Sequence, residues 1–195
     1  MQNSKWGVVN NADERCYVVL LVSRKKDNID ISDFVERRES FITTYDFKSD
    51  YLRQKFNDFV NAGLPGEQSR IYYSVNARHL PTIRKQLLHF LIDDDKFNLC
   101  SIQSKIAGIA AQKDCAIEKK WMIDFDSKDA ALLKEMLNDI KQADDTIDIT
   151  TCDTPNGHAV ILNHGFDIRL FAEKWKDVAT IKKDDLQCIN WKRKV

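Results

Sequence analysis

The sequence predicts a mixed α/β fold, because apolar runs typical of strands alternate with segments whose apolar residues recur at helical spacing. Residues 16–23 read CYVVLLVS, a continuous apolar and β-branched run that indicates a strand buried on both faces. Residues 49–60 and 81–92 carry apolar side chains three and four positions apart, which favours amphipathic helices. The chain has 195 residues, 43% of them hydrophobic, enough for one compact domain or two small lobes.

The composition argues against several classes of protein. The 30 Lys and Arg residues balance the 30 Asp and Glu residues, which does not suit a wholly basic nucleic-acid coat but permits local charged patches. No apolar stretch approaches about 18 residues and the N-terminus shows no secretory signal, so we expect no membrane association. The five cysteines are scattered without a Cys-x-x-Cys pair, which favours free thiols, a cytoplasmic location and no zinc site.

The first half of the chain reads as alternating strands and helices. FITTY at residues 41–45 predicts a second strand, and the amphipathic helix at 49–60 follows it. RIYYSV at 70–75 predicts a third strand, followed by the helix that Pro81 opens. This alternation implies parallel strands joined by crossover helices, so we interpret residues 1–115 as an N-terminal α/β module.

Basic residues gather beside two of these elements. Arg24 and Lys25 directly follow the first strand, where open α/β sheets tend to place anionic ligands. Arg78 and Arg84 lie around the start of the helix at 81–92. We expect these four side chains to contact nucleic acid; a solvated basic loop is the alternative explanation.

The second half predicts a strand, a helix, a hairpin, another helix and a last strand. WMIDFD at residues 121–126 forms the first strand, and an amphipathic helix follows it. Residues 146–152 and 158–162 form a hairpin around a turn-rich DTPNG sequence, and 186–191 form the last strand. The order β-α-β-β is similar to the ferredoxin-like or RRM-type arrangement, so we interpret residues 116–195 as such a unit.

Two acidic residues share one face of the strand at 121–126. Asp124 and Asp126 are two positions apart, so in an extended strand both carboxylates leave the same face, while Ile123 and Phe125 point into a core. Adjacent carboxylates repel each other unless a cation lies between them, and Mg²⁺ or Mn²⁺ accepts carboxylate oxygens. A solvated strand edge is the alternative reading of this pair.

Three motifs in this half resemble those of the archaeo-eukaryotic primase and primase-polymerase superfamily. They are Asp124-x-Asp126, TPNGH ending at His158, and GFDIR with Asp167, in the order of the family's acidic hDhD, small-x-His and acidic hD motifs. The resemblance covers residues 121–169. It implies an RRM-like catalytic palm with an N-terminal α/β module, and metal-dependent, template-directed nucleotidyl transfer of the kind used in DNA replication.

The resemblance also implies roles for individual residues. Asp124, Asp126 and Asp167 would hold Mg²⁺ or Mn²⁺ and act in catalysis, since phosphoryl transfer needs charge neutralisation and positioning. A histidine beside a Gly-rich turn can approach a triphosphate closely, and an arginine adds an anion contact. The residues implied for binding the nucleoside triphosphate are Asn156, Gly157, His158 and Arg169.

The sequence departs from the family in several ways. Only Gly157 precedes the histidine where family members usually carry two glycines, and neither a zinc-binding stem nor a helical accessory domain is present. A protein partner would supply the missing parts. We expect a metal-dependent nucleotidyltransferase of primase-polymerase type. One alternative is a catalytically inactive primase-like protein that binds nucleic acid or has a regulatory role. The other is a metal-dependent nuclease, since the same acids can activate water.

Overall fold

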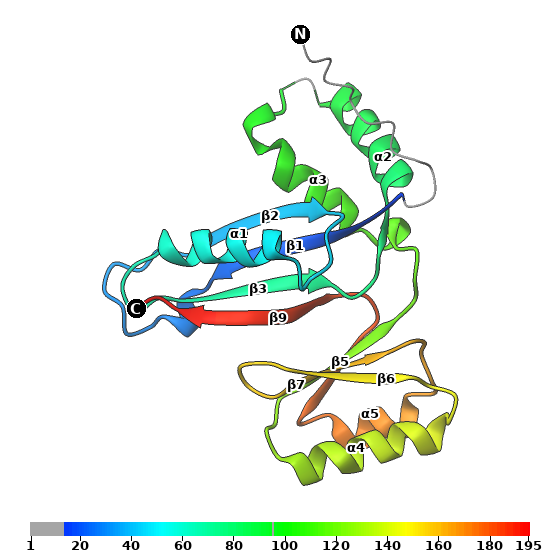
Figure 1. Ribbon diagram of the computed structural model, residues 1–195. Coiled ribbons are helices and arrows are strands. Elements are labelled where there is room, and N and C mark those ends of the chain that lie inside the picture. Colours follow the sequence, from blue (N-terminus) through cyan, green and yellow to red (C-terminus); the bar gives the residue numbers. More distant parts are fainter. Residues whose placement is uncertain (1–13, 95) are drawn as a thin grey trace.

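The computed structural model describes residues 14–94 and 96–195, which form two antiparallel sheets and five α-helices (Figure 1). The predicted mixed α/β character is confirmed. The strands are β1 (Arg15–Ser23), β2 (Arg37–Thr43), β3 (Gln68–Ser74), β4 (Arg78–His79), β5 (Trp121–Phe125), β6 (Ile149–Asp153), β7 (His158–Leu162), β8 (Ala179–Lys182) and β9 (Leu186–Arg193). The helices are α1 (Asp50–Asn61), α2 (Leu80–Asp93), α3 (Ile102–Ala110), α4 (Ala130–Ala143) and α5 (Arg169–Trp175).

The first sheet has the strand order β2-β1-β3-β9, with the short β4 beside the start of β1. Its central strand is β1, as the continuous apolar run predicts. The predicted parallel pairing is wrong, because β2 and β3 both run antiparallel to β1. The chain turns back after β1 through a loop whose only helical part is a 3-10 turn at Lys25–Asp27, too short for the crossover that parallel neighbours require.

Helix α1 covers one face of this sheet. Val19 and Leu21 of β1 pack with Phe56 and Phe59 of α1 in one buried cluster. The predicted start of α1 is confirmed, since the Ser49 hydroxyl accepts a hydrogen bond from the Leu52 N–H. Because side chains alternate along β1, the residues between and beside Val19 and Leu21 point to the opposite face of the sheet. Helices α2 and α3 cover that face only at one end. The remainder of that face is turned toward the second sheet.

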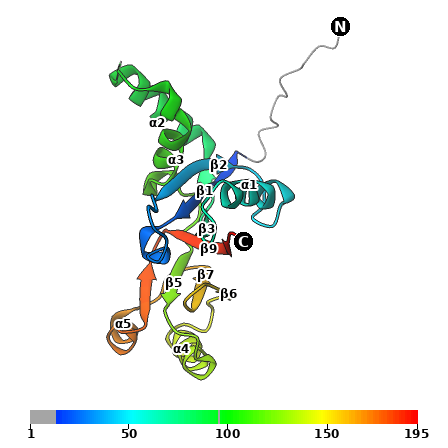
Figure 2. The ribbon, with the colours of Figure 1, turned by 90° about the vertical axis from the view of Figure 1, so that its left-hand side faces the viewer.

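The second sheet has the strand order β6-β7-β5-β8, with every neighbouring pair antiparallel. Its chain order is β5-α4-β6-β7-α5-β8, and α4 and α5 both lie on the face away from the first sheet. Ile123 and Phe125 of β5 are buried against these helices with Met136 and Trp175. Figure 2 shows the two sheets between α2 and α3 at one end and α4 and α5 at the other.

The last strand, β9, returns to the first sheet and pairs with β3. Residues 116–195, interpreted as one unit, therefore contribute to both sheets. Two connectors join the sheets, at 116–120 and 183–185, and Asn76 holds both through hydrogen bonds to the Lys120 backbone and the Asp184 carboxylate. Because this amide is fully buried, its hydrogen bonds fix the connectors relative to the first sheet.

Arg78 completes the junction between the sheets. It is 1% exposed and donates from Nη1 and Nη2 to the two carboxylate oxygens of Asp184, at 2.7 and 2.8 Å. This corrects the prediction that Arg78 contacts nucleic acid. Its guanidinium lies inside the protein and serves an internal ion pair.

The cysteines are all unpaired, as predicted, and three of them are buried. Burial raises the pKa of Cys16 and of Cys188 to about 11, so these thiols stay protonated at neutral pH. Over the described residues, every helix is too short or too polar to span a bilayer. The N-terminal residues used to predict that no secretory signal is present lie outside the described part of the chain.

Candidate functional site

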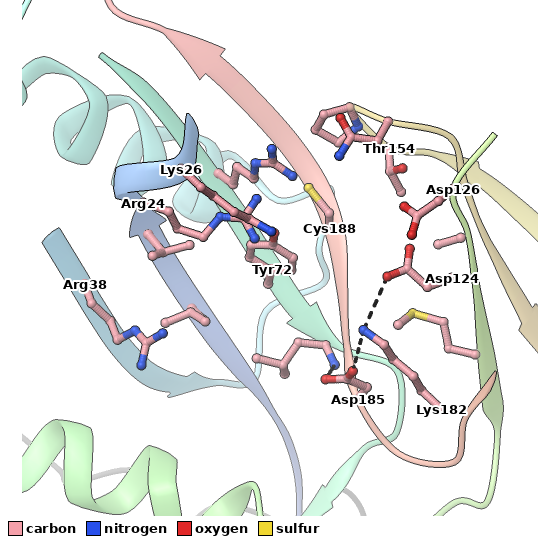
Figure 3. Close-up of a pocket in the computed structure, with 18 residues that line it drawn as sticks. Arg24, Lys26, Arg38, Tyr72, Asp124, Asp126, Thr154, Lys182, Asp185 and Cys188 are labelled. Carbon is pink, nitrogen blue, oxygen red and sulfur yellow. Dashed lines mark hydrogen bonds and ion pairs between the residues drawn. The ribbon is translucent and has the colours of Figure 1, made fainter. Parts of the chain in front are cut away.

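A polar cleft with a volume of about 580 Å³ lies between the two sheets (Figure 3). One wall is the uncovered face of the first sheet, and it presents cationic side chains. The other wall is the free face of the second sheet, and it presents carboxylates. The cleft is therefore divided by charge, with a positive side and a negative side facing each other.

Strand register builds the positive wall. Val22 of β1 pairs with Arg38 of β2 on one side and with Arg70 of β3 on the other, so these three side chains share the face that borders the cleft. Arg24 and Lys26 follow the end of β1 and extend the same wall. The cations that line the cleft on this side are Arg24, Lys26, Arg38 and Arg70.

Asp27 orders part of this wall. Its two carboxylate oxygens accept from Arg24 Nε at 2.9 Å and from Arg70 Nη2 at 2.6 Å. Arg70 is only 6% exposed, and its buried Nε has no hydrogen-bond partner among the described residues. Lys26 and Arg38 are exposed and form no ion pair with any described residue. The wall thus keeps excess positive charge and unused donors for an anionic ligand.

The negative wall carries the predicted acidic pair. Asp124 and Asp126 both line the cleft, whereas Ile123 and Phe125 are buried on the other face of β5. The shared face predicted from their spacing is therefore confirmed. The ammonium of Lys182 on β8 lies 3.3 Å from Asp124 Oδ2, so the pair already has one cationic neighbour within the protein.

The turn between β6 and β7 closes the cleft beside Asp126. Thr154, Pro155 and Asn156 line the cleft. The Thr154 N–H donates to the Gly157 carbonyl at 2.9 Å, and the Gly157 N–H donates to the Thr154 hydroxyl. A side chain at Gly157 would collide with the Phe125 carbonyl and come within 2.7 Å of the Ser127 nitrogen. Glycine is required here because the turn lies directly against the backbone around Asp126.

Replacing Gly157 with alanine should lower the free energy of unfolding by about 1–3 kcal/mol, because the new methyl group meets backbone rather than a movable side chain. Urea denaturation of the variant measures this loss. Gly108→Ala is the matched control, since a methyl group at that helical position meets open space and should leave the stability unchanged or slightly higher. Equal stability of Gly157→Ala and wild type would contradict the close packing of this turn.

His158 lies on the wrong face of the sheet for its predicted role. It pairs with Phe125 across β5 and β7, so its side chain lies on the face covered by helices. Its ring stacks on Phe125, and its Nδ1 is 3.0 Å from Asp153 Oδ1. The β7 residue that faces the cleft opposite Asp124 is Ala159. A small-x-His motif starting at Gly157 would need its histidine at this alanine position.

Asp167 and Arg169 also lie away from the predicted site. They line a different pocket, beside α5, and pair with each other at 2.9 Å between Arg169 Nε and Asp167 Oδ1. Hydrogen bonds from Arg169 hold the pKa of Asp167 at about 2. The prediction that Asp167 joins Asp124 and Asp126 is therefore corrected: its carboxylate serves a local ion pair on the surface.

Of the other basic residues predicted to bind nucleic acid, only one lines the cleft. Arg24 lines the cleft, whereas Lys25 is exposed on the 3-10 turn next to it and Arg84 is exposed on α2. Three side chains that line the cleft could not be found from the sequence, because only strand register brings them together. They are Arg38, Arg70 and Lys182. Asp185, on the connector before β9, also lines the cleft.

The acidic wall suits one kind of metal site. Within residues 14–94 and 96–195, no three His, Cys, Asp or Glu side chains converge as ligands of a preformed cage. Mg²⁺ commonly uses only one or two protein carboxylates and takes its other ligands from water and substrate phosphates. Asp124 and Asp126 fit that pattern, since Asp124 on β5 and Asp126 directly after it both line the cleft.

Comparison with known proteins adds no further assignment. Neither a scan against protein-family models nor searches of curated proteins and of solved structures found a match to this chain.

Proposed function

We propose that this protein is a metal-dependent nucleotidyltransferase of primase-polymerase type that binds a nucleoside triphosphate in the cleft between its sheets. The observation that carries this proposal is the opposition of four cationic side chains on one wall to Asp124 and Asp126 on the other. A metal-bound triphosphate has the complementary arrangement, with anionic oxygens on one side and a divalent cation on the other. Few other small ligands would use both walls at once.

The two walls take different parts of this ligand. Arg38 and Arg70 present planar guanidinium groups that suit phosphate oxygens, and Asp27 holds Arg70 in place for that contact. Asp124 and Asp126 would hold Mg²⁺ or Mn²⁺ on the facing wall. When bound, the metal would neutralise charge on the transferred phosphoryl group. The protein itself contributes binding and alignment of the reacting groups.

The connectivity of the second sheet supports the same assignment. The chain order β5-α4-β6-β7-α5-β8 with sheet order β6-β7-β5-β8 is similar to the ferredoxin-like or RRM-type arrangement. On this proposal the second sheet is the palm, and its first strand presents Asp124 and Asp126 to an N-terminal module that supplies phosphate-binding cations. Nucleic acid would be the second substrate, and the unpaired cysteines favour the cytoplasm as the compartment.

A second function is favoured by two specific observations. Ala159 stands where the motif would need its histidine, and Asp167 lies outside the cleft. A catalytically inactive primase-like protein that binds nucleotide or nucleic acid, alone or with a protein partner, would retain the basic wall without needing either group. The two functions differ in whether a triphosphate is consumed, with a new phosphodiester bond formed and pyrophosphate released, or is only bound.

The role of the basic wall is tested with Arg38→Gln, which removes an exposed cation from the cleft. We expect wild type to melt at a higher temperature with Mn²⁺ and a nucleoside triphosphate, because a ligand that binds the native state stabilises it. Arg38→Gln should weaken triphosphate affinity about tenfold or more, since a hydrogen bond to a charged group contributes about 1.5–3 kcal/mol.

Arg84→Gln is the control for this measurement, because Arg84 is exposed on α2 and lies away from the cleft. It should show the wild-type shift in melting temperature. If Arg38→Gln and Arg84→Gln respond to the triphosphate equally, the basic wall is not the phosphate site.

A further inference from the structure

The ammonium of Lys182 occupies the negative wall at the place where a metal would be needed. Its Nζ lies 3.3 Å from Asp124 Oδ2 and 3.0 Å from Asp185 Oδ2, so it bridges two carboxylates of the cleft (Figure 3). Lys182 pairs with Met122 across β5 and β8, and both side chains therefore face the cleft. The position is built by strand register and does not depend on a mobile loop.

We infer that Lys182 is a built-in counter-cation that competes with the divalent metal for Asp124, so that metal binds tightly only when a triphosphate draws Lys182 away. This inference rests on the proposed function. It assigns to Lys182 control over the order in which ligands enter: in the free protein Lys182 pairs with Asp124, and metal and triphosphate bind together.

Electrostatics support the competition. A lysine ammonium is charged at neutral pH, and the carboxylates of Asp124 and Asp185 at 3.3 and 3.0 Å favour that charged form. A divalent ion on Asp124 would share this carboxylate with the ammonium and would lie close to it, so each cation disfavours the other.

The cleft also offers Lys182 an alternative partner. A lysine side chain has a flexible four-carbon stem, and its ammonium binds phosphate as a point charge. Phosphate oxygens placed between the two walls would lie within the same cleft that Lys182 lines. Moving from Asp124 to the phosphates would free a carboxylate oxygen for the metal, which makes the two binding events mutually favourable.

The test uses Mn²⁺ alone, with free Mn²⁺ measured by its electron paramagnetic resonance signal. Lys182→Met keeps most of the stem and removes the charge, so it should bind Mn²⁺ about tenfold more tightly than wild type. Lys183→Met is the matched control, because the Lys183 ammonium lies 5.1 Å from the centroid of the Trp121 ring and Lys183 lines a different pocket. The control should bind Mn²⁺ as wild type does.

Three outcomes would decide the inference. Tighter Mn²⁺ binding by Lys182→Met that is lost on adding Asp124→Asn supports it. Tight, Asp124-dependent binding by wild type that Lys182→Met does not improve would overturn it while leaving the proposed function standing. Failure of Lys182→Met to bind Mn²⁺ would also overturn the inference, whereas the proposed function is overturned only if Mn²⁺ and a nucleoside triphosphate together leave the melting temperature of wild type unchanged. If Lys182→Met does not fold, Lys182→Gln replaces it with the same expected result.

Discussion

The double replacement Asp124→Asn/Asp126→Asn should abolish metal-dependent nucleotidyl transfer while leaving the protein folded. Asparagine keeps the size of each side chain but removes the charge that binds a divalent cation. Loss of about 4 kcal/mol of transition-state stabilisation corresponds to a rate about 10³-fold lower, which brings activity close to background. Primer extension under single-turnover conditions measures this loss.

The free energy of unfolding of the same variant shows whether the two carboxylates serve ligand binding or the stability of the fold. Asp124 is partly exposed and Asp126 is exposed, so neutral side chains there should change the free energy of unfolding by less than about 1 kcal/mol. Asp177→Asn, an exposed carboxylate in the loop before β8, is the control and should retain full activity. Activity that survives the double replacement would show that these acids do not hold the catalytic metal.

Arg78→Met should lower the free energy of unfolding by about 3–5 kcal/mol. Arg78 is buried, and its two hydrogen bonds to Asp184 anchor the connector that carries the chain from β8 to β9. Removing the guanidinium leaves the Asp184 carboxylate in a poorly solvated position without its counter-charge, which costs more than the intact pair contributes. Denaturation by urea gives the size of the loss.

Two comparisons make this second prediction specific. Arg84→Met removes an exposed arginine from α2 and should change stability by no more than about 0.5 kcal/mol. Replacing Asp184 with asparagine in the Arg78→Met background should recover part of the loss, because no unpaired charge then remains in this partly buried position. If Arg78→Met is as stable as Arg84→Met, the junction between the sheets does not depend on this ion pair.

Much of the local structure could be predicted from the sequence. The apolar run that became β1, the Ser49 cap of α1 and the common face of Asp124 and Asp126 all follow from short-range periodicity and capping, which neighbouring residues determine. Which strands pair with each other could not be predicted in the same way. Antiparallel pairing of β1 and the return of β9 to the first sheet depend on contacts between distant segments, which periodicity does not report.

The residues of the candidate site were harder to predict for the same reason, because they come from distant segments of the chain. Arg38 and Arg70 are far apart in the sequence and share one wall only because both pair with Val22 of β1, so no local motif could have identified the basic wall. His158 was misplaced for a different reason: a shift of one residue along a strand sends a side chain to the opposite face. The missing residue between Gly157 and the histidine in TPNGH was the available signal.

Primer extension by the wild-type protein tests the proposed function most directly. Labelled primer annealed to a longer template is incubated with Mn²⁺ and nucleoside triphosphates, and with each omitted in turn. A nucleotidyltransferase acting from this cleft lengthens the primer only when template, metal and triphosphates are all present. An unchanged primer, despite a metal-dependent rise in melting temperature with triphosphate, would show a binding protein; a primer shortened without triphosphates would show a nuclease, and either result would contradict the proposed function.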